Sequence, residues 1–313
     1  MPIIKKVAII GTGVIGTGWI IRCLAHNKIV YAYDKDIRLK KNLIGEIKRT
    51  WPYVKKLFNK KKLNLKNFKY FTSIEETLRD ADFIQECVSE NYVLKTKLMT
   101  VIGKYAKSKA IISSSSSGLL PTKIYSKCKN PERGLIGHPF NPVYMLPAVE
   151  IVPGKKTTKK YLNKASKFYK SISMNPIMVK HELPGYLSDR LQEALWREGL
   201  HIINEGHATT EDLDRAIEDG PGLRWSLMGT FLTFHLAGGK SGMKHMLEQF
   251  GPALKFPWTK LKAPKLSNKL INRLIEGTKS QSKGKSVAKI SNIRDEYLVE
   301  IQKLRRKYEK KLR

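Results

Sequence analysis

The sequence predicts an α/β protein in which a doubly wound, mostly parallel sheet is followed by an all-helical domain. The chain opens with a β-branched run from Ile3 to Ile10, a glycine-rich turn and an apolar segment that extends to Leu24, which is the order strand, turn, helix. Short apolar runs then alternate with helix-forming segments as far as Val179, and such alternation is typical of parallel sheets covered by helices. From about Tyr186 the apolar residues recur at helical spacing instead.

The first domain contains six further strand candidates and two well-marked helices. The apolar run from Ile29 to Tyr33 ends at an aspartate, and lysine-rich amphipathic sequence follows to about Lys69. Helices are expected from Asn91 to Tyr105 and from Lys159 to Ser171. The remaining predicted strands are Asp82 to Val88, Ala110 to Ser113, Gly134 to His138, Val149 to Val152 and Pro176 to Val179.

Leu183-Pro184-Gly185 is the expected joint between two domains, residues 1–184 and 185–313, because proline and glycine interrupt regular structure. Beyond the joint, Thr209 and Asp212 have the spacing of a capping box that opens a helix. The Ser- and Lys-rich stretch from Lys279 to Ser286 predicts a mobile linker before a final basic helix. The first predicted helix of this domain has an apolar side formed by Leu187, Leu191, Ala194, Leu195, Ile202 and Ile203.

The composition indicates a packed globular protein with a strongly basic surface. Among 313 residues, 41% are hydrophobic and the formal net charge is +32. Lysine supplies 45 of the 59 basic residues, whereas recognition of phosphates and guanine edges favours arginine. We therefore favour solvated lysine-rich faces over nucleic-acid binding and keep contact with an anionic partner as the alternative. The excess charge is concentrated in Val54 to Lys69, Ile151 to Lys170 and Gly277 to Arg313.

The cysteines and the first residues predict a cytoplasmic protein. Cys23, Cys87 and Cys128 are odd in number and lack CxxC spacing, so neither a disulfide framework nor a metal site is indicated. The first residues lead directly into a strand, so we expect no secretory signal. No apolar run reaches 18 residues, and we expect no membrane span.

The GTGVIG turn has the pattern of a dinucleotide-binding loop in a Rossmann-type domain. Gly11 permits the tight turn, Gly13 lets the backbone approach a pyrophosphate, and Gly16 lets helix and strand pack closely. Asp34 follows Gly16 by eighteen residues at the end of the second strand, where a carboxylate binds ribose hydroxyls and repels a 2′-phosphate. The pattern therefore predicts NAD as the cofactor, and a purely structural turn is the alternative.

A histidine and a glutamate form the predicted reacting pair. His138 stands at a strand end in GHPFNP, where two prolines stiffen the following loop. Histidine titrates near neutral pH and is suited to accept a hydroxyl proton while hydride leaves for a nicotinamide. Glu150 lies twelve residues later, at the start of the next strand, and its carboxylate can orient the ring and stabilise the imidazolium.

These residues and several further motifs resemble the 3-hydroxyacyl-CoA dehydrogenase family over essentially the whole chain. The matching segments are GTGVIG, QECVSEN with Lys95, the serine run that ends at Ser117, GHPFNP, Val149-Glu150 and Pro184-Gly185-Tyr186. The resemblance implies that Ser117 binds the substrate oxygen, that His138 is the general acid/base and that Glu150 orients it. It also implies that Asn141, Glu90 and Lys95 line the cofactor, and that the chain forms a homodimer through its helical domain with the active site at the domain cleft.

One position departs from the acyl-CoA members, because Asp189 stands where they carry asparagine. The second half, with DGPGLRW and MGTFLTFHLAGG, is similar to the branch of the family that oxidises L-carnitine, and more distantly to the lambda-crystallin gulonate dehydrogenases. Carnitine carries a carboxylate and a trimethylammonium group around a secondary alcohol. Arg224 is the candidate for the carboxylate, and an extra carboxylate at Asp189 favours a cationic head. Candidates for an aromatic cage are Trp225, Phe231 and Phe234.

Each of these assignments has an alternative. Arg224 is equally suited to a structural salt bridge, the three aromatic residues to core packing, Asp189 to pairing with its neighbour Arg190, and His235 is expected in the core. Together the patterns predict an NAD-dependent 3-hydroxy acid dehydrogenase that acts on L-carnitine. The alternatives are another small 3-hydroxy acid or a 3-hydroxyacyl-CoA as substrate, or a binding role as a polyanion-associated or crystallin-like protein.

Overall fold

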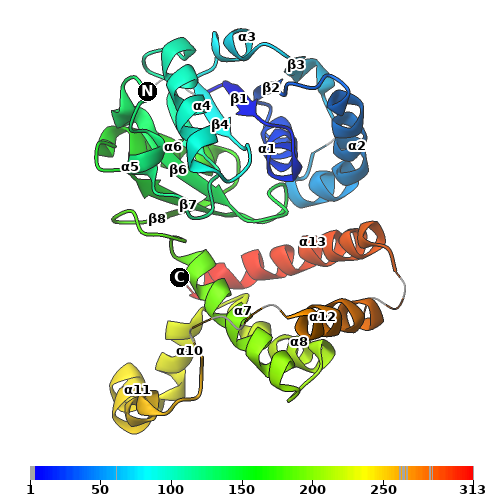
Figure 1. The fold of residues 1–313 in the computed structure, drawn as a ribbon, viewed down its shortest axis with the longest axis vertical. Coiled ribbons are helices and arrows are strands. Elements are labelled where there is room, and N and C mark those ends of the chain that lie inside the picture. Colours follow the sequence, from blue (N-terminus) through cyan, green and yellow to red (C-terminus); the bar gives the residue numbers. More distant parts are fainter. Residues whose placement is uncertain are drawn as a thin grey trace. The chain divides into compact units, whose positions relative to one another are not determined.

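The computed structural model describes residues 4–312 except 61, 261, 263–264, 266, 282 and 284. The described chain divides into two compact units, one ending at Arg190 and the other beginning at Leu191, and each is considered by itself (Figure 1). The first unit is built on an eight-stranded sheet with flanking helices, and the second is helical. The predicted fold class is therefore confirmed.

The sheet has the strand order β3-β2-β1-β4-β5-β6-β7-β8, which reverses direction of growth at β1. All neighbouring strands are parallel except β6 and β7, which pair antiparallel. Ligands of doubly wound sheets bind beyond the carboxyl ends of the strands, where the order reverses. The strands are β1 (Lys6–Ile10), β2 (Ile29–Tyr33), β3 (Phe68–Phe71), β4 (Phe83–Glu86), β5 (Ile111–Ser114), β6 (Gly134–Pro139), β7 (Ala148–Pro153) and β8 (Asn175–Met178).

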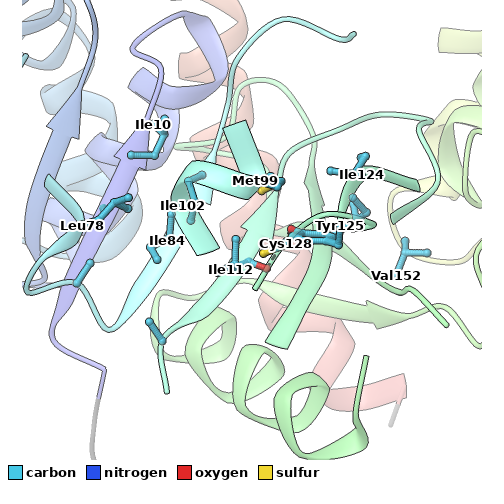
Figure 2. Packing of buried hydrophobic residues seen from close by; sticks show 14 of the residues in the cluster. Ile10, Leu78, Ile84, Met99, Ile102, Ile112, Ile124, Tyr125, Cys128 and Val152 are labelled. Atoms are coloured by element: carbon cyan, nitrogen blue, oxygen red, sulfur yellow. Dashed lines mark hydrogen bonds between the residues drawn. The ribbon is translucent and has the colours of Figure 1, made fainter. Parts of the chain in front are cut away.

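Helices cover both faces of this sheet, and successive strand residues alternate between them. Ile84 of β4 packs into a cluster with Met99 and Ile102 on one face (Figure 2). Its neighbour Phe83 points to the other face, where its ring stacks on Phe168 with centroids 4.0 Å apart. The helices are α1 (Val14–Ala25), α2 (Leu39–Phe58), α3 (Ile74–Leu78), α4 (Tyr92–Tyr105), α5 (Pro121–Ile124) and α6 (Lys159–Ser171), with 3-10 turns at Leu65–Asn67 and Pro131–Arg133.

The lysine-rich amphipathic sequence after β2, to which no boundaries were assigned from the sequence, contains both a helix and a strand. Asn59 adopts a left-handed conformation, with φ of 50°, and ends α2 at Phe58. The following residues return to the sheet as β3, an edge strand of sequence Phe-Lys-Tyr-Phe. The strand was not predicted because it has only four residues and its neighbours in the sequence are rich in lysine.

The helical unit has few buried apolar side chains. Its helices begin with α7 (Ser188–Glu205), which starts in the first unit, and α8 (Thr210–Glu218), whose predicted capping box between Thr209 and Asp212 is confirmed. The described apolar residues buried in this unit are Leu200, Ile203, Leu270 and Val299. The other helices are α9 (Pro221–Trp225), α10 (Thr230–Ala237), α11 (Gly242–Phe250), α12 (Asn268–Gln281) and α13 (Val287–Leu312), with 3-10 turns at Gly239–Ser241 and Gly251–Lys255.

The helix predicted from the apolar side of residues 187–203 is present as α7, where Ile203 is buried and Leu191 and Leu195 are exposed. The linker prediction needs correction. The stretch from Lys279 to Ser286 is not all linker, because α12 continues to Gln281; positions 282 and 284 lie outside the described residues. Among the helices that the structure describes, none combines the length and the apolar character that a membrane crossing requires.

Candidate active site

The glycine loop joins β1 to α1 and leaves the amino end of the helix open. Gly11 has φ of +95°, a conformation that favours glycine, and a Cβ there would lie 3.0 Å from the carbonyl oxygen of Cys87. A Cβ on Gly16 would lie within 2 Å of the Gly11 carbonyl oxygen, so helix and turn pack without a side chain between them. By contrast, a Cβ on Gly13 would meet nothing within 4 Å. The space beside Gly13 is therefore available to a ligand.

This open helix end fits the pyrophosphate of a dinucleotide. Gly13 caps α1 without any side-chain hydrogen bond, and the first turn of α1 carries no acidic residue. The first amides of α1 therefore retain their capacity to bind an anion, which the helix dipole also favours. Val14, the first residue of α1, has 71% of its surface exposed. The residues present thus suit NAD, whose phosphates would be held by the amides at the start of α1.

Asp34 supports the loop from the end of β2. Its Oδ2 atom accepts hydrogen bonds from the backbone N–H and the hydroxyl of Thr12, both at 3.0 Å. The carboxylate that sequence analysis assigns to the ribose is therefore also a structural partner of the glycine turn. Thr12 was not singled out from the sequence, although it lies between the first two glycines of the motif.

His138 and Glu150 face each other across the antiparallel pair of β6 and β7. The two residues are direct partners in the strand register, which explains why twelve residues separate them. The Nδ1 atom of His138 lies 2.8 Å from Oε2 of Glu150, and both side chains are almost completely buried. The second carboxylate oxygen, Oε1, accepts the backbone N–H groups of Leu187 and Ser188 at 3.0 Å. Every oxygen of this buried carboxylate is thus hydrogen-bonded.

Hydrogen bonding keeps Glu150 ionised and thereby sets the tautomer of His138. Burial raises the pKa of the Glu150 carboxyl, but the hydrogen bonds from His138, Ser188 and Leu187 outweigh burial, and the pKa lies below its usual 4.5. An ionised carboxylate only accepts hydrogen bonds, so Nδ1 of His138 carries the proton. Nε2 of the neutral ring then presents a lone pair, which is what a general base requires.

Asp189 and two aromatic rings surround the other side of the imidazole. Oδ2 of Asp189 lies 3.7 Å from Nε2 of His138, within range of an ion pair with imidazolium but too long for a hydrogen bond. The rings of Phe140 and Tyr186 lie 5.1 and 5.7 Å from the His138 ring, measured between centroids. The rings limit the movement of the imidazole. Neither aromatic residue was predicted as a site residue, although each belongs to a motif that was quoted.

Ser117 is placed by Glu90. Oε1 of Glu90 accepts the Ser116 hydroxyl at 2.5 Å and the backbone N–H of Ser117 at 3.0 Å. Ser117 itself is exposed, and among the described residues its hydroxyl makes no hydrogen bond to His138. Within the sheet-containing unit the structure therefore brings His138, Glu150 and Asp189 together, while the backbone N–H of Ser117 is bound by Glu90.

Lys95, which is expected to line the cofactor, is buried, with 1% of its side chain exposed. Its Nζ atom donates to both oxygens of buried Glu86, at 2.8 and 3.0 Å, and to the Val88 carbonyl at 3.0 Å. Glu90 lies further away, at 3.5 Å. Any influence of Lys95 on a cofactor is consequently exerted through the loop of Val88 and Glu90.

Asn141 is exposed in the loop that follows His138. The buried side chain of Arg22 binds this loop. The Arg22 guanidinium donates to the carbonyl oxygens of Val143 at 2.7 Å and Leu146 at 2.8 Å. It also donates to the Ile172 carbonyl at 3.1 Å. Because Arg22 comes from α1, the helix that begins at the glycine loop also fixes the loop that carries Asn141.

The four substrate candidates lie in the helical unit. Arg224 and Trp225 are in α9, Phe231 and Phe234 are in α10, and all four are exposed. Phe231 is 83% exposed. The alternative of core packing within this unit is therefore wrong for the three aromatic residues.

The expectation of a core histidine is also wrong. His235 is exposed, and its Nδ1 atom accepts the backbone N–H of Met243 at 3.1 Å. All positions of α10 except Thr233 are exposed within this unit, His235 among them.

Comparison with known proteins agrees with this geometry. The family description "3-hydroxyacyl-CoA dehydrogenase, NAD binding domain" matches residues 6–182, and the description of the C-terminal domain of the same family matches residues 185–286. The chain belongs to the 3-hydroxyacyl-CoA dehydrogenase family. It is accordingly an NAD-dependent oxidoreductase that acts on a CH–OH group, as predicted.

Relatives within the 3-hydroxyacyl-CoA dehydrogenase family carry a more specific name. The chain is 50% identical to L-carnitine dehydrogenase of Oceanobacillus iheyensis over 95% of this chain and 97% of that protein. It is 48% identical to L-carnitine dehydrogenase of Bacillus cereus, over 97% and 94%. For L-carnitine dehydrogenase of Pseudomonas aeruginosa the identity is 47%, over 95% and 93%.

Solved structures share the fold at lower identity. An NAD-dependent 5-formyl-3-hydroxy-2-methylpyridine 4-carboxylic acid 5-dehydrogenase has a TM-score of 0.81 at 21% identity, over 97% of this chain and 99% of that one. (S)-3-hydroxybutyryl-CoA dehydrogenase from Ralstonia eutropha has a TM-score of 0.63 at 21% identity, over 90% and 94%. These two similarities concern the fold alone.

Proposed function

We propose that this dehydrogenase oxidises L-carnitine to 3-dehydrocarnitine with NAD. The observation that carries the proposal is the sequence identity of 45–50% with relatives named L-carnitine dehydrogenase over nearly their whole length. The site geometry supports it, because the acid/base pair of His138 and Glu150 has a third carboxylate, Asp189, beside the reactive nitrogen. A carboxylate at that point favours a substrate with a cationic group.

The proton chemistry is assigned to His138. Nε2 accepts the proton of the C3 hydroxyl, and Glu150 stabilises the resulting imidazolium through its bond to Nδ1. NAD, when bound, accepts the hydride from C3. Ser117 and the protonated His138 act as hydrogen-bond donors to the substrate oxygen. The exchange is balanced, since the alcohol loses one hydride and one proton and becomes a ketone.

The cofactor contacts follow from the glycine loop and its neighbours. Gly11, Gly13 and Gly16 shape the pyrophosphate site, and Asp34 binds the ribose while it also supports Thr12. Asn141, Glu90 and Lys95 would line the cofactor, Lys95 as a support for Glu90.

The helical unit supplies the substrate contacts. The Arg224 guanidinium pairs with the carnitine carboxylate, since planar bidentate recognition suits carboxylates. The trimethylammonium group is enclosed by aromatic rings, whose faces attract weakly hydrated cations, and the candidates are Trp225, Phe231 and Phe234. Their exposure in this unit supports a ligand-binding role over a core role.

A homodimer is part of the proposal. The helical unit exposes many large apolar side chains, and such surfaces in a folded protein mark contact sites. Members of this exposed set include Leu191, Trp196, Leu223, Leu254, Trp258 and Tyr297. The partner that the proposal names is a second copy of the chain, through the same unit.

The test is a comparison of substrates at alkaline pH, where release of a proton favours oxidation. NADH formation is followed with L-carnitine, 3-hydroxybutanoate, L-gulonate and 3-hydroxybutanoyl-CoA in parallel. We expect the highest kcat/KM with L-carnitine and inhibition of that reaction by other trimethylammonium compounds. A preference for 3-hydroxybutanoate or the CoA thioester would contradict the assignment of the cationic site and leave the dehydrogenase assignment intact.

A further inference from the structure

A cavity lies in the sheet-containing unit, at the amino ends of its central strands. It has a volume of about 600 Å³ and is bounded by the chain before β1, β4 and β5 and by one side of α6. Because β1, β4 and β5 are parallel, the glycine loop lies beyond the carboxyl end of β1 whereas this cavity lies at the amino ends. The five residues of β1, at about 3.3 Å each, separate the two. The cavity is thus distinct from the dinucleotide site.

The floor of this cavity is apolar and rigid. The Phe168 ring is fixed by its stacking on Phe83, with centroids 4.0 Å apart. Nearby, Nζ of Lys28 donates to the carbonyl oxygen of Ile4 at 2.9 Å and holds the chain that enters β1. The apolar lining residues are Ile4, Ala110, Ile111 and Phe168. Ala110, Ile111 and Phe168 are each at most 4% exposed, and Nζ of Lys28 lies 5.8 Å from the centroid of the Phe168 ring, so the floor offers a ligand a limited apolar contact surface.

The rim of the cavity is cationic. Six lysines and one aspartate line it. The aspartate, Asp82, is already neutralised, because it accepts the backbone N–H of Lys6 at 3.1 Å and pairs with Lys107 at 3.3 Å. Lys6 pairs with Asp80 outside the cavity at 3.4 Å. The remaining four lysines form no ion pair with any described residue, and they are Lys5, Lys109, Lys164 and Lys167.

We propose that this cavity binds a nucleoside polyphosphate, with its phosphates among the unpaired lysines and its ring on the apolar floor. Several ammonium groups without carboxylate partners attract multiply charged oxyanions, and lysine binds phosphate as a point charge. A purely apolar ligand leaves the lysines uncompensated, and inorganic polyphosphate leaves the floor unused. The volume is in the usual range for small-molecule sites. Because the cavity and the glycine loop lie at opposite edges, both ligands bind at once.

The experiment measures ATP binding to the intact protein saturated with NADH. Calorimetry in magnesium-free buffer gives the affinity and stoichiometry, and the fluorescence of bound NADH reports whether the dinucleotide stays in place. We expect one ATP per chain without loss of NADH. Adenosine and tripolyphosphate, used separately as probes, are each expected to bind at least about tenfold more weakly than ATP, because each makes only part of the contacts.

Two double variants of α6 distinguish the cavity from the general surface charge. Lys164→Glu with Lys167→Glu reverses two rim charges, and Lys159→Glu with Lys160→Glu makes the same change in net charge one turn away, outside the cavity. We expect the first pair to weaken ATP binding by about tenfold or more and the second by less than about threefold. Thermal unfolding and NADH binding verify that both variants are folded.

Three results would overturn the proposal. Equal losses in the two double variants would mean that ATP responds to net charge alone. Displacement of NADH by ATP would assign ATP to the dinucleotide site. Tripolyphosphate that binds as tightly as ATP would remove the role of the apolar floor, and with it the nucleoside part of the ligand.

Discussion

The two units of this chain differ in how their candidate functional side chains are held. In the sheet-containing unit, intrachain hydrogen bonds already hold the groups expected to react or bind, as in the contact of His138 with Glu150 and of Asp34 with Thr12. In the helical unit, Arg224 and Phe231 stand exposed on short helices, and few apolar residues are buried. The candidate side chains of the first unit are held by contacts within the chain, whereas those of the second are exposed within their own unit.

This difference separates the kinetic effects that substitutions should have. A group held by a buried network contributes to the transition state, so its loss lowers kcat. A group that is ordered only by its ligand contributes mainly to binding, so its loss raises KM or weakens association. Substitutions in the two units should therefore differ in the quantity that they change most.

Replacement of the proton acceptor should have the largest effect. His138→Ala is expected to lower kcat by about 10⁴-fold, the upper range for general acid–base catalysis, while NADH affinity stays within about twofold. Steady-state kinetics and fluorescence titration measure the two quantities. His181→Ala, which changes an exposed histidine of the same unit, is the control and should leave kcat unaffected. Full turnover by His138→Ala would remove the acid/base assignment.

Loss of the orienting carboxylate should come next. Glu150→Gln removes the charge beside Nδ1 of His138 while it keeps the shape, and we expect kcat to fall by about 10²- to 10³-fold. The pH profile of kcat should also move, since a neutral amide no longer stabilises imidazolium. A fall in kcat without any change of the profile would indicate a purely structural role.

In the helical unit the expected effect is on substrate affinity. Arg224→Ala should raise the KM for L-carnitine by about 10- to 100-fold, because it removes a charge-assisted contact, and should leave kcat within about threefold. The matched control is Arg215→Ala on α8, another exposed arginine. An unchanged KM would return Arg224 to a structural role.

Association should respond to the exposed apolar surface of the same unit. Leu254 is 84% exposed, and Leu254→Asp is expected to weaken self-association by about tenfold through desolvation of a charge at the contact. Sedimentation velocity over a concentration series measures the change. The sheet-containing unit offers a control in Val14→Asp, an equally apolar exposed position that should affect NADH binding and not association.

The smallest expected effect concerns stability in acid. Because the pKa of Glu150 is lower in the folded protein than its usual 4.5, its ionised form stabilises the fold above that pH, and this contribution is lost as the pH falls through the folded-state pKa. The stability advantage of the wild type over Glu150→Gln should therefore shrink below about pH 4.5. Urea unfolding of both proteins at pH 7 and pH 4 measures it, and an advantage that is constant with pH contradicts the prediction.

Much of the fold was predictable from local patterns. The strand Ile29–Tyr33 and the helix Lys159–Ser171 have the predicted bounds, because each is a clear periodic segment with distinct ends. The strand Phe68–Phe71 was missed, since an edge strand of four residues has too short a pattern to recognise. The antiparallel pairing of β6 with β7 was not predicted either, because strand direction depends on contacts between distant residues that no local pattern encodes.

The site shows the same division. The glycine loop and the pair of His138 and Glu150 follow from motifs whose residues lie close in sequence. The supports of these motifs come from distant positions: Arg22 reaches the loop after His138 across more than 120 residues, and Leu187 and Ser188 donate to Glu150 from the start of α7. Such partners meet only when the chain is folded, so they cannot be predicted from the spacing of residues in the sequence.

The position of β6 and β7 inside the sheet also has a consequence for how the protein should respond to warming. His138 and Glu150 lie on β6 and β7, two neighbouring buried strands between β5 and β8. The two side chains therefore separate only when this part of the sheet opens. Amide hydrogen exchange in β6 and β7 should accordingly require nearly global unfolding, whereas amides of α10 exchange through small local openings. On warming, α10 should therefore open before the contact of His138 with Glu150 is lost.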